Sequence, residues 1–299
     1  MRVRFSAAFG LWVVSVFASP VLASSDEPFW NSRPLSHWVT VLRDGDTQAR
    51  TEAARALGEI ATSHGAASVA PQLELLSACL DVADANLRGA AAGAIAQLGP
   101  AGEPASDRLV PLFLHDPDSG VRRQAGLALT RVAPTAPATV TAEARVLGSD
   151  ADGAVRQAAA AGLVQAGSDA AAAREAAQRA LTDGDALVRV YAAAVVAHLG
   201  DVPSAIPVLL AGLTHEDTGV RVEAAGLLAA VAPAHAAAVP SLTRALHDPD
   251  AQVRLAAVDA LGAIGHPARP AIDSLWRLMR DEDEAVRDGA LRAIRLIRE

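Results

Sequence analysis

One short pattern returns eight times along this chain and constrains its fold more than any other feature. In each copy an arginine follows an aspartate by four residues, and successive arginines are 32 to 38 residues apart. The pairs are Asp46 and Arg50, Asp84 and Arg88, Asp118 and Arg122, Asp152 and Arg156, Asp185 and Arg189, Asp217 and Arg221, Asp250 and Arg254, and Asp283 and Arg287. A period of this length is typical of architectures in which small similar units stack in a row.

The residues around each arginine predict that it opens an amphipathic helix. Apolar residues stand at offsets −1, +3, +7 and +10 from the arginine, as Val253, Ala257 and Leu261 do around Arg254. These offsets share one face of a helix with 3.6 residues per turn. A second apolar-periodic segment, such as residues 239–246, precedes each acidic turn. Each unit is therefore expected to be a helix, a short turn and a second helix, which buries its apolar face only against its neighbours.

The composition agrees with an all-α fold whose core contains few large rings. Apolar residues make up 51% of the chain but aromatic residues only 3%. Alanine favours the helix intrinsically and lets helices approach each other closely. Since no stretch of useful length alternates as a strand does, the fold class is expected to be all-α.

The repeated pattern resembles that of a known family. Residues 240–265 read P-x-L-x-x-x-L-x-D-x-D-x-x-V-R-x-x-A-x-x-x-L-x-x-I-G, which is similar to the HEAT repeats, and particularly to their short bacterial form of the phycobilisome-lyase type. The match extends, with departures, from about residue 34 to residue 299. The resemblance implies an α-solenoid, a right-handed superhelix of about eight stacked helix-turn-helix repeats. It implies little about function, because this scaffold serves many unrelated tasks.

The recurring aspartates and arginines have a structural interpretation. An aspartate four residues before the arginine stands where the helix begins, so its carboxylate can accept from free N–H groups of the first turn. In HEAT repeats, acids of this turn and the arginine form a ladder between successive units, and the resemblance implies the same here. The earlier acid of the turn is present in six repeats, as Asp44, Asp116, Asp150, Asp183, Asp248 and Asp281. Val82 and His215 replace it in the second and sixth repeats, so we expect the ladder to weaken there.

The acids could instead form a metal site, but their spacing argues against it. A calcium loop needs a glycine at position 6 and a glutamate at position 12, and counting from Asp248 gives Val253 and Asp259. Deoxyhypusine hydroxylase resembles this chain in fold and holds two irons through several His-Glu pairs. Here only His215-Glu216 occurs. The phycobilin lyases also resemble it. The sequence therefore predicts no catalysis, no metal and no cofactor, with a metal- or cofactor-dependent enzyme of one of these two types as the alternative.

The first residues differ from the rest and predict export. Basic residues, a short apolar run and small residues before Ser24 make residues 1–23 a secretory signal, cleaved after Ala23. We therefore expect an extracytoplasmic protein, periplasmic or secreted, without a membrane span after cleavage; an uncleaved anchor is the alternative. Residues 24–33, with Phe29 and Trp30, are expected to cap the first repeat, and residues 34–299 to form the solenoid.

Charge and helix periodicity suggest what the protein binds. The chain contains no lysine and has a net charge of −8, which suits a nucleic-acid partner poorly.

In HEAT repeats the second helices line the concave side, where offsets +1, +5 and +8 are expected to face outward. In the central repeats these positions are mainly apolar, and the proposed strip for a protein or peptide partner comprises Val164, Val190, Tyr191, Ala194, His198, Val222 and Leu255. Two alternatives stay open: the small residues only allow a tightly curved inner face, or the protein is a purely structural spacer.

Overall fold

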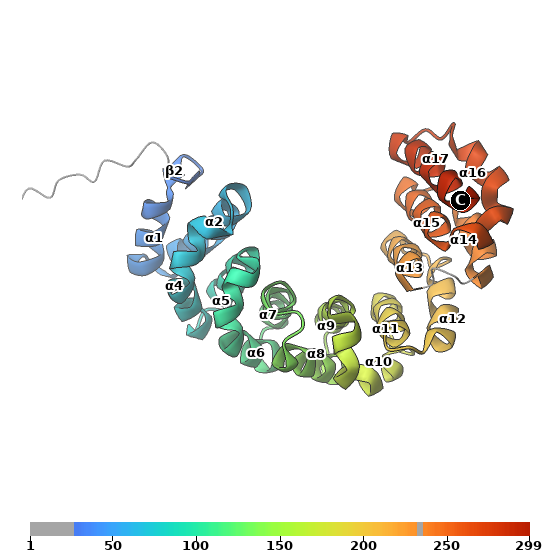
Figure 1. The fold of residues 1–299 in the computed structure, drawn as a ribbon. Coiled ribbons are helices and arrows are strands. Elements are labelled where there is room, and N and C mark those ends of the chain that lie inside the picture. The colour runs from blue at the N-terminus through green and yellow to red at the C-terminus, as the bar shows by residue number, and fades with distance from the viewer. Residues whose placement is uncertain (1–26, 232–235) are drawn as a thin grey trace, which may run out of the picture.

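The computed structural model of the protein describes residues 27–231 and 236–299. Within these residues the chain forms eight consecutive helix pairs arranged in an arch (Figure 1). The predicted all-α solenoid is confirmed. The predicted signal peptide and its cleavage after Ala23 lie outside the described residues.

Each pair consists of an outer and an inner helical segment. The outer segments are α1 (Leu35–Asp44); α3 (Ala66–Val69), η1 (Ala70–Gln72), α4 (Leu73–Ala78) and η2 (Cys79–Asp81); η3 (Gly99–Ala105) and α6 (Ser106–His115); α8 (Pro137–Ser149); η4 (Gly167–Ala173) and α10 (Arg174–Ala180); α12 (Val202–Gly212); η5 (Ala236–Ala238) and α14 (Val239–Ala245); and η6 (His266–Ala271) and α16 (Ile272–Leu278). The inner helices are α2 (Thr47–His64), α5 (Ala85–Gln97), α7 (Ser119–Val132), α9 (Gly153–Ala166), α11 (Ala186–His198), α13 (Thr218–Val231), α15 (Ala251–Ile264) and α17 (Glu284–Arg298).

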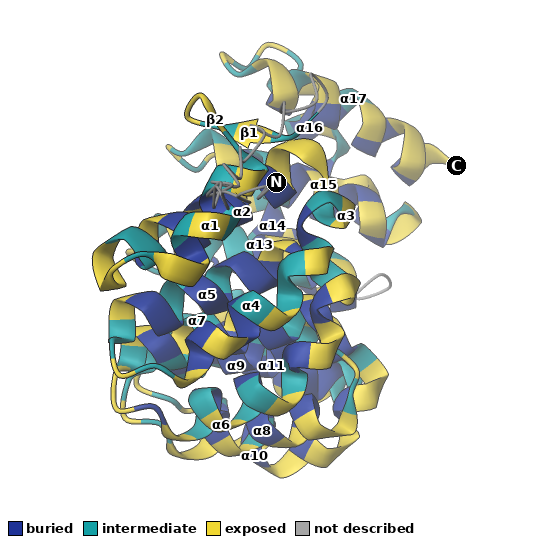
Figure 2. Ribbon diagram, turned by 90° about the vertical axis from the view of Figure 1, so that its left-hand side faces the viewer, coloured by how far each residue is buried: buried dark blue, intermediate teal, exposed yellow. Residues whose placement is uncertain are grey.

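The two layers divide the surface of the arch between them. The inner helices face the concave side and the outer helices the convex side (Figure 1). Consecutive inner helices, such as α2 and α5 or α5 and α7, pack directly on each other. Buried residues lie on the helix surfaces that meet neighbouring helices (Figure 2). Each repeat therefore completes its core with side chains of the next, as stacked repeats must.

Small residues allow this close approach of the helices. Alanines make up at least half of the buried residues of α5, α9 and α11. On α7, Gly126 lies against the ring of Phe113 from α6, and a Cβ atom added there would come within 2.6 Å of a ring carbon. A larger residue at this position would push the two helices apart.

A short hairpin covers the N-terminal end of the described stack. Strands β1 (Phe29–Trp30) and β2 (Arg33–Pro34) pair antiparallel. The ring of Trp30 lies 5.5 Å from that of Trp38 on α1, whose indole N–H donates to the Trp30 carbonyl oxygen at 3.3 Å. The ring of Phe29 meets that of His64 on α2 at 5.5 Å. These contacts bury Trp38 almost completely, with 1% of its surface exposed.

Candidate functional site: the arginine ladder and the concave face

All eight recurring aspartates stand at the start of an inner helix and accept backbone N–H groups of its first turn. The acceptor distances lie between 2.8 and 3.2 Å, for example 2.8 Å from the Gln252 N–H to Asp250 and 3.2 Å from the Val220 N–H to Asp217. Each carboxylate thus satisfies donors that would otherwise lack a partner in the helix. The interpretation as N-caps agrees with this geometry at every repeat.

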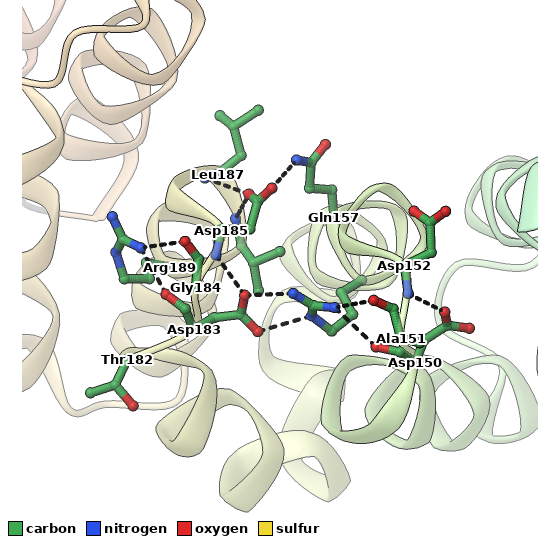
Figure 3. A network of polar contacts seen from close by, with 12 residues as sticks. Asp150, Ala151, Asp152, Gln157, Thr182, Asp183, Gly184, Asp185, Leu187 and Arg189 are labelled. Carbon is green, nitrogen blue, oxygen red and sulfur yellow. Dashed lines mark hydrogen bonds and ion pairs between the residues drawn. The ribbon is translucent and has the colours of Figure 1, made fainter.

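Five of the arginines link one repeat to the next through a complete rung. In each rung, Nε and Nη2 of the arginine donate to the two carboxylate oxygens of the earlier acid in the following turn, at 2.7 to 3.1 Å. The remaining nitrogen, Nη1, donates to backbone carbonyls of the arginine's own turn, and Figure 3 shows the surroundings of the rung at Asp183. The complete rungs join Arg88 to Asp116, Arg122 to Asp150, Arg156 to Asp183, Arg221 to Asp248, and Arg254 to Asp281.

The rungs at Asp116 and Asp183 favour the ionised form of their carboxylates. Burial by itself would raise the pKa of Asp116, but hydrogen bonds from Arg88 and from the backbone N–H of Asp118 lower this pKa below its ordinary value of 3.8. The hydrogen bond from Arg156 likewise lowers the pKa of Asp183, against the effect of burial. Bidentate pairing of this kind is stronger than a neutral hydrogen bond, so the rungs contribute to the stability of the stack.

The ladder is interrupted at the two positions where the sequence lacks the acid. Opposite Val82, Arg50 donates instead to the Leu42 carbonyl oxygen at 3.0 Å and to Sγ of the buried Cys79 at 3.5 Å. Opposite His215, Arg189 donates through Nη1 to the carbonyl oxygens of Asp183 and Gly184, at 2.7 and 3.2 Å. The last arginine of the pattern, Arg287, has only the corresponding bonds to Asp281 and Glu282 within the described residues.

The proposed concave strip is only partly accessible, and two of its members need correction. Val190 and Ala194 are buried, with 2% and 0% of their surface exposed. The reason is that α11 packs against α12 and α13 of the following repeat as well as against α9 and α10. A Cβ added at Gly212 on α12 would lie 3.0 Å from a methyl group of Val190, so the backbone of α12 packs directly against this side chain.

The other members of the strip are partly exposed. Val164, Val222 and Leu255 belong to this group, as do Tyr191 and His198. Burial, together with the charge and hydrogen bonding of Glu223 from the next repeat, raises the pKa of Tyr191 to about 12. Leu127 on α7 is 39% exposed, and it stands at offset +5 in the third repeat, a concave position that the sequence interpretation did not include.

A hollow on the inner helices of the N-terminal half was not predicted. The concave groove, as we call it, has a volume of about 410 Å³ and crosses α2, α5 and α7. Charged and amide side chains line it, including Arg55, Arg123 and Gln124. Gly89 and Gly93 also line it, at offsets +1 and +5 of the second repeat. Two glycines at these outward-facing offsets are the signal by which the groove could have been found in the sequence.

One buried acid was also not predicted from the sequence. Glu143 on α8 is 0% exposed and lies where α7, α8 and α9 meet. Its Oε1 accepts from the Thr130 hydroxyl at 3.4 Å, and its Oε2 has no hydrogen-bond partner in the described part of the chain. Burial raises the pKa of Glu143 to about 8, although the hydrogen bond from Thr130 acts in the opposite direction.

Neither a metal-binding cluster nor a membrane-spanning helix occurs among residues 27–231 and 236–299. No three or more His, Cys, Asp or Glu side chains of these residues come together with metal-binding geometry. Within the same ranges, no helix combines the length and the apolar character that crossing a membrane requires.

Comparison with known proteins matches this architecture to a family. The family model described as HEAT repeats matches residues 35–130, 144–225 and 206–295. The chain belongs to the HEAT-repeat family. Its fold is similar to the complex of CpcE and CpcF of phycocyanin lyase from Nostoc sp. PCC7120, with a TM-score of 0.57 and 23% identity over 93% of this chain and 98% of that one.

A second solved structure agrees in fold. It is YibA of Escherichia coli, with a TM-score of 0.54 and 17% identity over 87% of this chain and 92% of that one. No curated protein matches the chain in sequence. At these identities the solved structures show the shared fold alone.

Proposed function

We propose that this HEAT-repeat protein is a non-catalytic scaffold that binds a protein or peptide partner on its concave face. The observation that carries the proposal is the concave groove, which is lined by residues of the inner helices α2, α5 and α7. These helices face the inner side of the arch (Figure 1). Because Gly89 and Gly93 line the groove without side chains, the main chain of a partner can approach the helices closely. Guanidinium and amide groups at its edges supply donors for the carbonyl groups of such a chain.

Apolar side chains continue the same inner surface beyond the groove. Leu127 on α7 is exposed, and Val164, Val222 and Leu255 are partly exposed on α9, α13 and α15. Apolar residues flanked by polar ones are typical of surfaces that bind a partner segment. The similar structure from Nostoc is itself a complex of two proteins, which supports partner binding as a use of this scaffold.

The concave face is tested by filling the groove without disturbing the fold. A Cβ at Gly93 would meet only a side-chain atom of Gln124 at 3.8 Å, so Gly93→Gln should fold normally and gain up to about 1 kcal/mol of helix propensity. With a photo-crosslinker at Leu127 in cells, we expect Gly93→Gln to reduce crosslinking of the partner at least about tenfold, equal to a binding loss of about 1.4 kcal/mol.

A matched control exists on the convex side. Gly148 on α8 is exposed, and a Cβ there would meet only an Arg179 nitrogen at 3.9 Å, so Gly148→Gln should leave crosslinking unchanged. A second crosslinker at Glu175 on α10 should capture nothing specific. Equal capture in the Gly93→Gln and original proteins, or capture only from Glu175, would contradict binding on the concave face.

We also propose that the protein acts outside the cytoplasm. The support is the basic head, apolar run and small-residue site of residues 1–23. N-terminal sequencing of the protein isolated from the cell envelope or the medium should find Ser24 as its first residue. An intact residue 1 in a membrane fraction would instead favour an uncleaved anchor, and a purely cytoplasmic protein would contradict the proposal.

A metal- or cofactor-dependent enzyme is the second candidate, favoured by the fold shared with the phycocyanin lyase complex. Elemental analysis and absorption spectra of the purified protein separate the two functions. Stoichiometric iron or a bound pigment would replace the scaffold proposal with this one.

A further inference from the structure

The interrupted rung between the fifth and sixth repeats leaves an arginine without a carboxylate. Nη1 of Arg189 makes its usual bonds to the carbonyl oxygens of Asp183 and Gly184 (Figure 3). Its Nε and Nη2 have no hydrogen-bond acceptor in the described part of the chain, whereas at the complete rungs these two nitrogens hold both oxygens of an aspartate. The position that an acceptor would occupy is thus defined by the other rungs.

His215 stands where the missing aspartate would be, but it offers a donor instead. Its Nδ1 accepts from the backbone N–H of Asp217 at 3.1 Å, just as Oδ1 of Asp116 accepts from Asp118 in its own turn. Because a backbone N–H can only donate, Nδ1 carries no proton, and the neutral ring bears its proton on Nε2. The histidine therefore preserves the turn while removing the acceptor for Arg189.

A pocket opens at this interrupted rung. The Arg189 pocket, as we call it, has a volume of about 610 Å³, while the corresponding hollows at the complete rungs of Arg122 and Arg221 have about 320 and 460 Å³. Arg189 and His215 line one part of the pocket. Its apolar walls include Leu181, Val190, Val208 and Val220, contributed by the fifth and sixth repeats.

We propose that the Arg189 pocket binds a carboxylate attached to an apolar group, with the two carboxylate oxygens held by Nε and Nη2 of Arg189. The ligand would supply the group that an aspartate supplies at the complete rungs, and a guanidinium matches a carboxylate in this two-bond geometry. The apolar walls suit a hydrocarbon attached to the acid, and the volume falls within the range of small-molecule sites. Glu216, an exposed residue of the lining, and the net charge of −8 disfavour multiply charged anions such as phosphate.

The proposal is tested with hexanoate as the probe and the full chain labelled with ¹⁵N-arginine. Hexanoate should shift the Nε–H resonance of Arg189 saturably, whereas hexanol should not. Arg189→Gln should weaken hexanoate binding about tenfold or more, because both charge-assisted bonds are lost. His215→Asp should close the rung with the protein's own carboxylate, abolish hexanoate binding and raise the thermal unfolding midpoint, which also shows that this variant is folded.

A second pair of probes identifies the source of the carboxylate. An acetylated tripeptide with a free C-terminal leucine carboxylate is compared with its C-terminal amide. Tighter binding of the free peptide than of hexanoate assigns the pocket to a polypeptide end. Tighter binding of hexanoate assigns it to a small organic acid.

As the matched control, Arg287→Gln removes an arginine with the same two backbone bonds and should leave binding unchanged. Absence of saturable binding to the original protein, or equal binding to His215→Asp, would overturn the proposal. Neither outcome depends on whether the concave groove binds a partner.

Discussion

Replacing Asp116 with alanine is expected to lower the free energy of unfolding by about 3–5 kcal/mol, because it leaves a buried guanidinium without its counter-charge. Asp116 and Arg88 are only 6% and 8% exposed, and their two bonds measure 2.7 and 2.8 Å. The substitution also removes the acceptor of the Asp118 N–H. No other side chain among those described accepts from Nε or Nη2 of Arg88, so the cost is not recovered within the turn.

The loss should be measured by urea denaturation and localised by hydrogen exchange. Since each repeat contacts mainly its neighbours, faster exchange is expected first in α5 and in the start of α7, because the rung joins α5 to the turn between α6 and α7. Asp44→Ala is the matched control: this acid is the corresponding residue of the first repeat, is exposed and pairs with no arginine of residues 27–231 and 236–299. Its removal should therefore change stability by less than about 0.5 kcal/mol. Similar losses in both variants would mean that the rung itself contributes little.

Lowering the pH should destabilise the fold through this rung, as removing Asp116 does. The pKa of Asp116 is lowered in the folded chain relative to 3.8. A carboxyl with a lowered folded pKa stabilises the fold fully above its unfolded pKa and loses that contribution as the pH falls through the folded value. The difference between the original protein and Asp116→Ala should therefore shrink below about pH 4.

Glu143→Gln is expected to remove a loss of stability that the original protein shows as the pH rises. This dependence has the opposite sign to that of Asp116, whose contribution is lost as the pH falls. The pKa of Glu143 is raised from 4.5 to about 8 by burial, so the folded chain keeps a proton that the unfolded chain releases above pH 4.5. The original protein should then lose about 1.4 kcal/mol per pH unit between these two values, about 5 kcal/mol in all, while the amide variant loses none of it. Above pH 8 both states are ionised and the difference becomes constant.

Denaturation of both proteins at pH 5 and pH 8.5 measures this effect. The amide should be close to the original in stability at the lower pH and more stable by several kcal/mol at the higher one. Glu175→Gln on α10, where the carboxylate is 88% exposed, is the control and should show no such divergence. A constant difference between the original protein and Glu143→Gln at the two pH values would show that the carboxyl ionises normally in the folded chain.

Much of the ladder could be predicted from the sequence because its geometry repeats. The aspartate at each helix start, the arginine four residues later and the acid of the next turn occur at fixed offsets, so one interpretation serves every repeat. The missing acids at Val82 and His215 correctly located the interruptions at Arg50 and Arg189. The surroundings of each interrupted arginine were not predictable: Arg50 finds Cys79, whereas Arg189 borders a pocket.

The concave surface was predicted less well, because a helical wheel treats every inner helix alike. Val190 and Ala194 occupy the outward offsets of α11, yet α12 and α13 cover them. The same offsets remain open at Gly89 and Gly93 of α5, where they form a groove. Glu143 was not predicted for a related reason: a single polar residue on an outer helix gives no sign that three helices will enclose it.

By itself, the sequence determined that the protein is a stack of helix pairs and where neighbouring pairs exchange charge, because a local pattern with a fixed period specifies both. Only the tertiary structure decided which inner positions are covered, which acid is buried and how wide the space beside Arg189 is. These properties depend on the distance and angle between one repeat and the next, and small changes in side-chain volume across several helices set that spacing together.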